Sequence, residues 1–152
     1  MYTFNLGLKF ESIVKTYANR NALTFETGET LTYEMLNRKA NRFARRLIEL
    51  DVRQKDVVAI SGVKHAETYA CMLACLKIGA VYTIFDPDSP IERLNKIIHT
   101  GSPKALVIDN KQENSFTRIR DELNISVINT GDDFSKQMDR YELILDFLSL
   151  PS

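Results

Sequence analysis

The stretch VVAISGVKHAETYACMLACLKIGAVYTIF, residues 57–85, decides the fold of this chain. Its first five residues form a short, continuous, mostly apolar run, which is typical of a parallel strand covered on both faces. Residues 65–78 have the apolar spacing of a helix, and Gly79 is well placed to end that helix in a left-handed conformation. The strand AVYTIF follows at once, at residues 80–85. The stretch therefore predicts a strand, a crossover helix and a second, parallel strand.

Residues beyond this stretch continue the alternation. The prolines within 86–90 force a loop, and a helix follows through 91–99 and ends near Gly101. A strand at 104–108, a weaker helix at 115–123 and a strand at 126–130 complete the pattern. We therefore predict an α/β fold, in which 57–130 is an α/β repeat that forms a parallel sheet with flanking helices. The tail, 131–152, fits either an amphipathic helix or a lid, and the sequence does not separate the two.

Residues before this stretch predict two helices and a small N-terminal β-hairpin. The first helix covers 8–18, and the hairpin lies in ALTFETGETLTY, residues 22–33, with a three-residue connection at Thr27, Gly28 and Glu29. A strongly amphipathic helix then runs from Tyr33 to Leu50. Thr32 can cap this helix by accepting a backbone N–H, and Glu34 suits the positive end of its dipole.

Length and charge exclude several classes of protein. The 152 residues favour one domain, so we treat 1–152 as one unit. The 20 Lys and Arg residues are scattered among 20 Asp and Glu residues, which argues against nucleic acid as a partner. Apolar runs of about five residues are far too short to cross a membrane, which takes about 20. Because the first residues also lack a secretory signal, we expect a cytoplasmic protein.

A phosphate loop needs closely spaced glycines, and this chain has none. Its two nearest glycines, Gly62 and Gly79, are 17 positions apart, so neither a dinucleotide-binding fingerprint nor a Walker loop can be drawn. His65 and His99 make no metal or nucleophile motif, and we expect them at helix ends. Asp86 follows a buried strand, where α/β proteins bind ligands, but the Pro after it makes a turn cap the more frequent role.

The remaining candidates have structural explanations. Cys71 and Cys75 lie four residues apart on one helix face, so we expect two small, buried, unbridged side chains. The acidic pairs lie in polar connecting segments and predict solvated surface charge: Asp121 with Glu122, and Asp132 with Asp133. We therefore assign no catalytic, cofactor-binding or metal-binding residue.

Two motifs carry a family resemblance over about residues 9–109. LTYEMLNRKANRFARRLIEL, residues 31–50, resembles the first core motif of amino-acid adenylation domains, at Leu31, Thr32, Tyr33, Leu36, Asn37, Ala40, Asn41 and Ala44. LKIGAVYTIFDPDSPIERL, residues 76–94, resembles the second core motif, at Leu76, Lys77, Gly79, Tyr82, Asp86, Pro87, Pro90, Glu92, Arg93 and Leu94. The chain thus resembles the N-terminal part of an adenylate-forming enzyme, most like the adenylation domain of a nonribosomal peptide synthetase.

The chain also departs from these motifs. Met35 replaces the usual Glu of the first motif, which removes half of a reciprocal capping box. In the second motif the replacements include Ile84, where Pro is common; the full set is Ile78, Val81, Thr83, Ile84 and Phe85. The Asp-Pro ending at Asp86 is similar to that of peptide synthetases and their D-alanine-activating relatives. Acyl-CoA synthetases and luciferases usually have Asn-Pro there.

The resemblance implies an incomplete part of the large N-terminal domain of these enzymes. An intact enzyme of this family uses ATP and Mg²⁺ to form an acyl adenylate and then transfers the acyl group to a phosphopantetheine carrier protein. The family's phosphate loop, nucleotide-contacting motifs and catalytic Lys all come later in sequence, so this chain alone is expected to be inactive. Its expected partners are the remainder of the domain, the carrier and, through exposed apolar surface, a second copy. Two alternatives stay open: a fragment of an acyl-CoA or acyl-acid ligase, and a free-standing, non-catalytic binding module.

Overall fold

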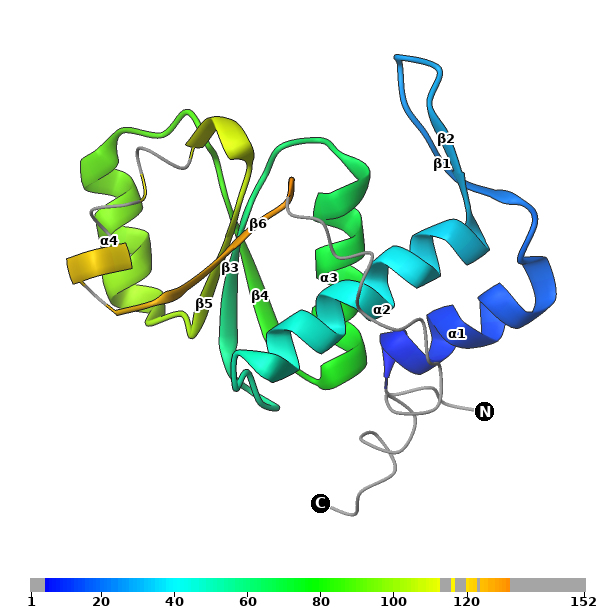
Figure 1. The fold of residues 1–152 in the computed structure, drawn as a ribbon, viewed down its shortest axis with the longest axis horizontal. Coiled ribbons are helices and arrows are strands. Elements are labelled where there is room, and N and C mark those ends of the chain that lie inside the picture. Colours follow the sequence, from blue (N-terminus) through cyan, green and yellow to red (C-terminus); the bar gives the residue numbers. More distant parts are fainter. Residues whose placement is uncertain (1–4, 113–115, 117–119, 123, 132–152) are drawn as a thin grey trace.

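The computed structural model describes residues 5–112, 116, 120–122 and 124–131 (Figure 1). Its helices are α1 (Leu6–Tyr17), α2 (Tyr33–Glu49), α3 (Ala66–Ile78) and α4 (Ile91–Gly101), with a 3₁₀ turn at Asn110–Gln112. Its strands are β1 (Asn21–Thr24), β2 (Thr30–Thr32), β3 (Val57–Ser61), β4 (Val81–Phe85), β5 (Ala105–Ile108) and β6 (Ser126–Asn129).

The predicted α/β fold is confirmed by a four-stranded sheet in the order β4-β3-β5-β6, in which every pair is parallel. The chain leaves β3 for β4 on one side and then crosses back to β5 on the other side. Because such crossovers are right-handed, this change of direction sends α3 and α4 to opposite faces of the sheet. Figure 1 shows α1, α2 and α3 on one face and α4 on the other.

The two central strands are buried on both faces, as the apolar run at 57–61 predicts. Val58 and Ile60 of β3 belong to a core with α2 and α3, whereas Ala59 faces the opposite core with α4. The same alternation holds in β5, where Val107 joins the first core and Leu106 the second. Side chains at successive strand positions point to opposite faces, so one short run supplies both cores.

The cap of α2 forms as predicted. The Oγ1 atom of Thr32 accepts a hydrogen bond from the backbone N–H of Met35 at 3.2 Å. Glu34, in the first turn, pairs with Arg38 one turn later at 2.8 Å. The apolar stripe of α2 packs on α3 and contributes Leu36, Ala40, Phe43, Ala44 and Leu47 to the core.

The predicted hairpin is present, but its connection lies one residue earlier than expected. The N–H of Phe25 donates to the carbonyl of Glu29, and the N–H of Gly28 donates to the carbonyl of Phe25, both at 2.9 Å. These bonds enclose a three-residue loop, 26–28, in place of the expected 27–29. Gly28 takes the last position with φ +87°, which is the left-handed residue that this turn type requires.

Other predicted boundaries also hold. Gly79 ends α3 with φ +73°, and its N–H donates to the carbonyl of Cys75. Of the helix predicted at 115–123, the described residues 116 and 120–122 are helical. The tail beyond Gly131, including Asp132 and Asp133, lies outside the described residues. Within the described part, no helix is long and apolar enough to span a membrane.

Candidate functional site

The sheet has a topological switch point where β3 and β5 lie side by side and their connections leave in opposite directions. Open α/β sheets bind ligands at this point, beyond the carboxyl ends of the strands. An open cavity of about 620 Å³ lies there. Apolar side chains such as Leu94 and Phe116 line part of it, and its polar lining residues are His65, Asp88, Ser89, Asp109 and Lys111.

His65 and Asp109 connect the ends of the two central strands. The Nδ1 atom of His65 lies 3.4 Å from the Oδ2 atom of Asp109, whose side chain is 15% exposed. The other oxygen, Oδ1, accepts a hydrogen bond from the backbone N–H of Lys111 at 2.9 Å. Asp109 thus starts the 3₁₀ turn with one oxygen and faces His65 with the other. Both side chains also line the switch-point cavity.

The two histidines lie at helix ends, as predicted. His65 is the N-cap residue of α3 and makes no side-chain capping bond. His99 lies in the last turn of α4.

Asp86 caps a turn, in agreement with the more frequent of its two predicted roles. Its Oδ1 atom accepts the backbone N–H of Asp88 at 3.0 Å, and its carbonyl accepts the N–H of Ser89 at 3.1 Å. The side chain is exposed and does not line the switch-point cavity, although Asp88 and Ser89 do. Asp86 therefore shapes the loop after β4.

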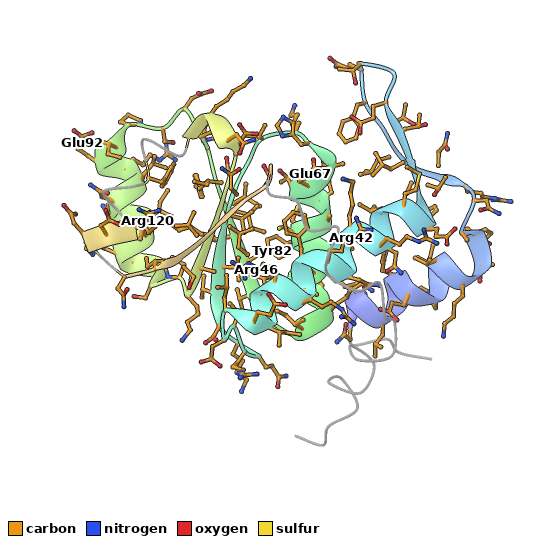
Figure 2. All side chains as sticks on the ribbon, viewed as in Figure 1. Arg42, Arg46, Glu67, Tyr82, Glu92 and Arg120 are labelled. Atoms are coloured by element: carbon orange, nitrogen blue, oxygen red, sulfur yellow. The ribbon has the colours of Figure 1, made fainter. Side chains whose placement is uncertain are left out.

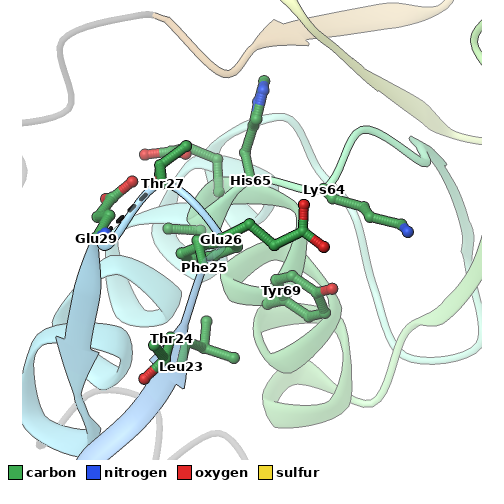
Figure 3. Close-up of a pocket in the computed structure, with 11 residues that line it drawn as sticks. Leu23, Thr24, Phe25, Glu26, Thr27, Glu29, Lys64, His65 and Tyr69 are labelled. Carbon is green, nitrogen blue, oxygen red and sulfur yellow. Dashed lines mark hydrogen bonds between the residues drawn. The ribbon is translucent and has the colours of Figure 1, made fainter.

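A second open cavity, of about 540 Å³, lies between the hairpin and the start of α3 (Figure 3). Phe25 and Tyr69 both line it, and their ring centroids lie 6.2 Å apart. Around them the charges are mixed, since Glu26, Glu29 and Glu67 share the lining with Lys64 and His65. Figure 3 shows Glu26 and Tyr69 facing the same space from the two elements. This mixture of acidic and basic side chains does not favour an anion over a cation as a ligand.

Glu67 also ties α3 to α2. Its Oε1 atom accepts a hydrogen bond from the Nζ atom of Lys39 at 2.7 Å. Partial burial raises the pKa of Glu67, but the hydrogen bond and the charge of Lys39, with help from the local backbone, outweigh burial and leave the pKa below its ordinary value.

A buried ion pair that was not predicted from the sequence joins α1 to α3. Lys77 Nζ donates to Glu11 Oε1, and the two side chains are 0% and 5% exposed. The Lys77 ammonium also lies 5.9 Å from the centroid of the Phe10 ring. Burial lowers the pKa of Lys77, and the hydrogen bond and charge of Glu11 oppose that shift. The sequence contains a pattern that could have predicted both buried charges, because each charged residue lies on the apolar stripe of its helix. Glu11 shares that stripe with Val14 in α1, and Lys77 shares it with Ala70 in α3.

Gly7 explains how α1 comes so close to α3. A Cβ atom at Gly7 would lie 2.9 Å from the Cα atom of Lys77, so only glycine fits there. The close approach brings Glu11, one turn further along α1, to Lys77. The Lys of the second motif is therefore a docking residue for α1.

Cys71 and Cys75 are fully buried and unbridged, as predicted. Burial raises the pKa of both thiols, that of Cys75 to about 12. The thiolate is the nucleophile, so neither residue is a reactive cysteine at neutral pH. Asp121 and Glu122 are exposed, which agrees with their predicted place on the surface.

The residues that the structure describes do not fit a nucleotide phosphate or Mg²⁺. A phosphate-binding loop would need closely spaced glycines, which the sequence lacks. The described residues also contain no group of three or more His, Cys, Asp or Glu side chains that could hold a metal ion. Part of each motif lies in the core: Leu36, Asn37, Ala40 and Asn41 are buried in α2, and Lys77 is buried in α3. The second motif also has exposed residues, among them Asp86, Glu92 and Arg93. That the chain contributes no catalytic residue stays a prediction.

Comparisons with known proteins agree with the two motifs. The family model described as AMP-binding enzyme matches residues 10–144. Surfactin synthase subunit 2 of Bacillus subtilis is 34% identical over 143 residues, which are 94% of this chain and 4% of that protein. The nonribosomal peptide synthetase sidE of Aspergillus fumigatus is 34% identical over 114 residues, which are 75% of this chain and 5% of that protein.

Solved structures share the fold at lower identity. ATP-bound MatB from Rhodopseudomonas palustris superposes with a TM-score of 0.80 at 20% identity, covering 90% of this chain and 29% of that one. The anthranilate CoA ligase AuaEII, in complex with anthranoyl-AMP, gives a TM-score of 0.75 at 19% identity and covers 83% of this chain and 25% of that one. The chain thus spans under a third of these structures and about a twentieth of the synthetases above. Because the family match extends over most of its length, the chain belongs to the AMP-binding enzymes, the adenylate-forming family that its two motifs indicate.

Proposed function

We propose that this chain is the N-terminal segment of an amino-acid-adenylating domain and supplies scaffold, not catalytic groups. The observation that carries the proposal is the position of the motif residues. Leu36, Asn37 and Ala40 of the first motif and Lys77 of the second are buried between helices. None of these four residues lines either cavity, whereas Pro87 and Leu94 of the second motif contribute to the wall of the switch-point cavity.

The proposed reaction is that of the relatives whose sequences match. An intact enzyme would join the carboxylate of an amino acid to the α-phosphate of ATP with Mg²⁺, release pyrophosphate, and pass the aminoacyl group to a phosphopantetheine thiol. Such chemistry depends on groups that position and stabilise the phosphates. Those groups would come from the remainder of the domain, and a carrier protein would be the second partner. The cytoplasm is the proposed location.

A chimera tests the scaffold role directly. Residues 10–144 of this chain, the span of the family match, would replace the corresponding residues of one adenylation domain of surfactin synthase subunit 2. We expect ATP–pyrophosphate exchange with the amino acid that the parent domain prefers, because the substrate pocket would come from the parent. A change of preferred amino acid in a folded chimera would contradict the scaffold role.

The chain by itself provides the complementary test. We expect no ATP–pyrophosphate exchange above the blank with any of the twenty common amino acids, using the intact parent domain as positive control. Exchange by the chain alone would show that it holds catalytic groups of its own and would overturn the proposal.

A further inference from the structure

We propose that two copies of this chain associate through the open edge of the sheet, with β4 of one copy pairing antiparallel to β4 of the other. Among the described residues β4 is one of the two edge strands of the sheet, and its inner side pairs with β3 in parallel register. The pairing would join two four-stranded sheets into one continuous sheet across a two-fold axis. The inference does not depend on the adenylation chemistry proposed above.

The hydrogen bonds between β4 and β3 show which backbone groups of β4 are left for this contact. The N–H of Val81 donates to the carbonyl of Asp56, and the carbonyl of Phe85 accepts from Gly62, both at 2.8 Å. Because strand residues alternate in direction, the N–H and C=O groups of Tyr82 and Ile84 point away from β3, toward the open edge.

The edge lacks the features that usually prevent such pairing. β4 reads Val-Tyr-Thr-Ile-Phe and contains no charged residue and no proline. Val81 is 52% exposed and Ile84 is 44% exposed, although both are β-branched apolar residues that favour strands. They lie on opposite faces of the strand, so both faces offer apolar surface at the edge. Tyr82, on the face of Ile84, packs partly against the core with α2 and α3 (Figure 2).

The sequence of β4 is complementary to itself when reversed. With Thr83 opposite Thr83 of the second copy, Val81 lies opposite Phe85 and Tyr82 lies opposite Ile84. Aromatic residues opposite β-branched residues, and Thr opposite Thr, are among the stabilising cross-strand pairs. In this register the outward residues, Tyr82 and Ile84, face each other and can exchange both backbone hydrogen bonds. Side-chain preference and backbone geometry therefore select the same register.

Charges at the two ends of β4 favour the antiparallel direction. At its amino end lies exposed Lys55, whose backbone N–H donates to the carbonyl of Gly79 at 2.9 Å. Lys96 lines a groove beside Thr83 and Val57, also toward that end. At the carboxyl end lies exposed Asp86, with Asp88 after it. Asp56 also lies at the amino end, where its Oδ2 atom accepts the backbone N–H of Arg53 at 2.7 Å. Antiparallel pairing brings Lys55 and Lys96 of one copy toward Asp86 and Asp88 of the other, which supports a second copy of this chain as the occupant.

Sedimentation velocity tests the association. We expect the chain to shift from monomer to dimer between about 1 µM and about 100 µM. Ile84→Lys places a charge in the pair with Tyr82 and should weaken the dimer at least about tenfold, because lysine is a natural blocker of strand edges. The matched control is Leu8→Lys, which makes the same kind of change at a residue of α1 that is 40% exposed and should leave the dimer unchanged. A monomer throughout this range, or equal effects of the two variants, would overturn the proposal.

Cysteine cross-linking tests the register. At the two-fold axis, Thr83 and its copy form a non-hydrogen-bonded pair with Cα atoms about 4.5 Å apart, within the range of a disulfide, about 4.4–6.8 Å. Thr83→Cys should therefore give a covalent dimer on mild oxidation. In Val81→Cys the two cysteines would lie about 14 Å apart, four residues along the strands, and should not cross-link.

The native thiols, Cys71 and Cys75, are fully buried and do not compete in this experiment. Cross-linking of Val81→Cys as fast as Thr83→Cys would contradict this register. Either failure would leave the scaffold role untouched, since that role is read from pyrophosphate exchange.

Discussion

Lys77→Met should be among the most damaging single substitutions in this chain, although the methionine side chain has a similar length. Lys77 is 0% exposed, and its ammonium is the partner of Glu11 Oε1. The second oxygen, Glu11 Oε2, is buried and has no hydrogen-bond partner among the described residues. The substitution would therefore leave a buried carboxylate without the positive charge of Lys77.

The expected size of the effect follows from this burial. Removing one partner of a buried ion pair costs about 3–5 kcal/mol, whereas replacing both partners with apolar residues is often close to neutral. At a urea m-value of about 2 kcal/mol per molar, the single substitution lowers the unfolding midpoint by about 2 M. The double variant Glu11→Leu/Lys77→Met should recover most of that loss, because no unpaired charge remains.

Urea unfolding would be measured for all four proteins of the double-mutant cycle. Circular dichroism would follow the unfolding, because the chain has no Trp to serve as a fluorescent probe. The expected coupling between the two sites is about 2–4 kcal/mol. A Lys77→Met cost below about 1 kcal/mol, or a double variant that loses the sum of the two single costs, would refute the view that this pair is buried and mutually dependent.

Three further predictions concern helix ends and charge. Gly79→Ala should cost about 1–2 kcal/mol in urea unfolding, because φ is +73° and the new Cβ would meet Gln54 at 2.9 Å. The control Gly101→Ala has open space and should stabilise by about 0.5–1 kcal/mol, so equal effects would contradict the reasoning. Thr32→Ala should cost about 1 kcal/mol by removing the cap of α2, and an unchanged midpoint would contradict that role. Because the pKa of Glu67 is lowered on folding, the unfolded chain binds its proton more tightly, and stability should fall as the pH drops below about 5. Glu67→Gln should lose less stability over that interval, and an equal loss would argue against the Lys39 pair.

The sheet could be predicted because its signals are local. The apolar run at 57–61, the stop at Gly79 and the prolines after β4 each determine backbone conformation where they occur. The strand order β4-β3-β5-β6 needed more than these signals, because it depends on which side of β3 each crossover returns to. The hairpin loop was misplaced by one residue, since Glu26 and Glu29 are both polar and only the backbone hydrogen bonds at Phe25 distinguish them.

The candidate site could be predicted only in part. The turn role of Asp86 followed from the proline after it, and the helix-end positions of His65 and His99 followed from helix boundaries. The pair of His65 with Asp109 could not be predicted, because the two residues come from different connections and meet only when β5 lies beside β3. The pairing of Lys77 with Glu11 could not be predicted for the same reason, because the two residues are 66 positions apart and come together only when α1 packs on α3.

We propose that this chain supports an adenylation site without forming its phosphate-binding part. Isothermal titration of the chain with Mg·ATP tests it most directly, with the intact parent domain of the chimera as positive control. We expect no saturable heat with ATP up to about 1 mM, which places any dissociation constant above the millimolar range. Saturable binding with a dissociation constant of about 10 µM or tighter would contradict the claim, because it would place a nucleotide site among residues to which we assign only a structural role.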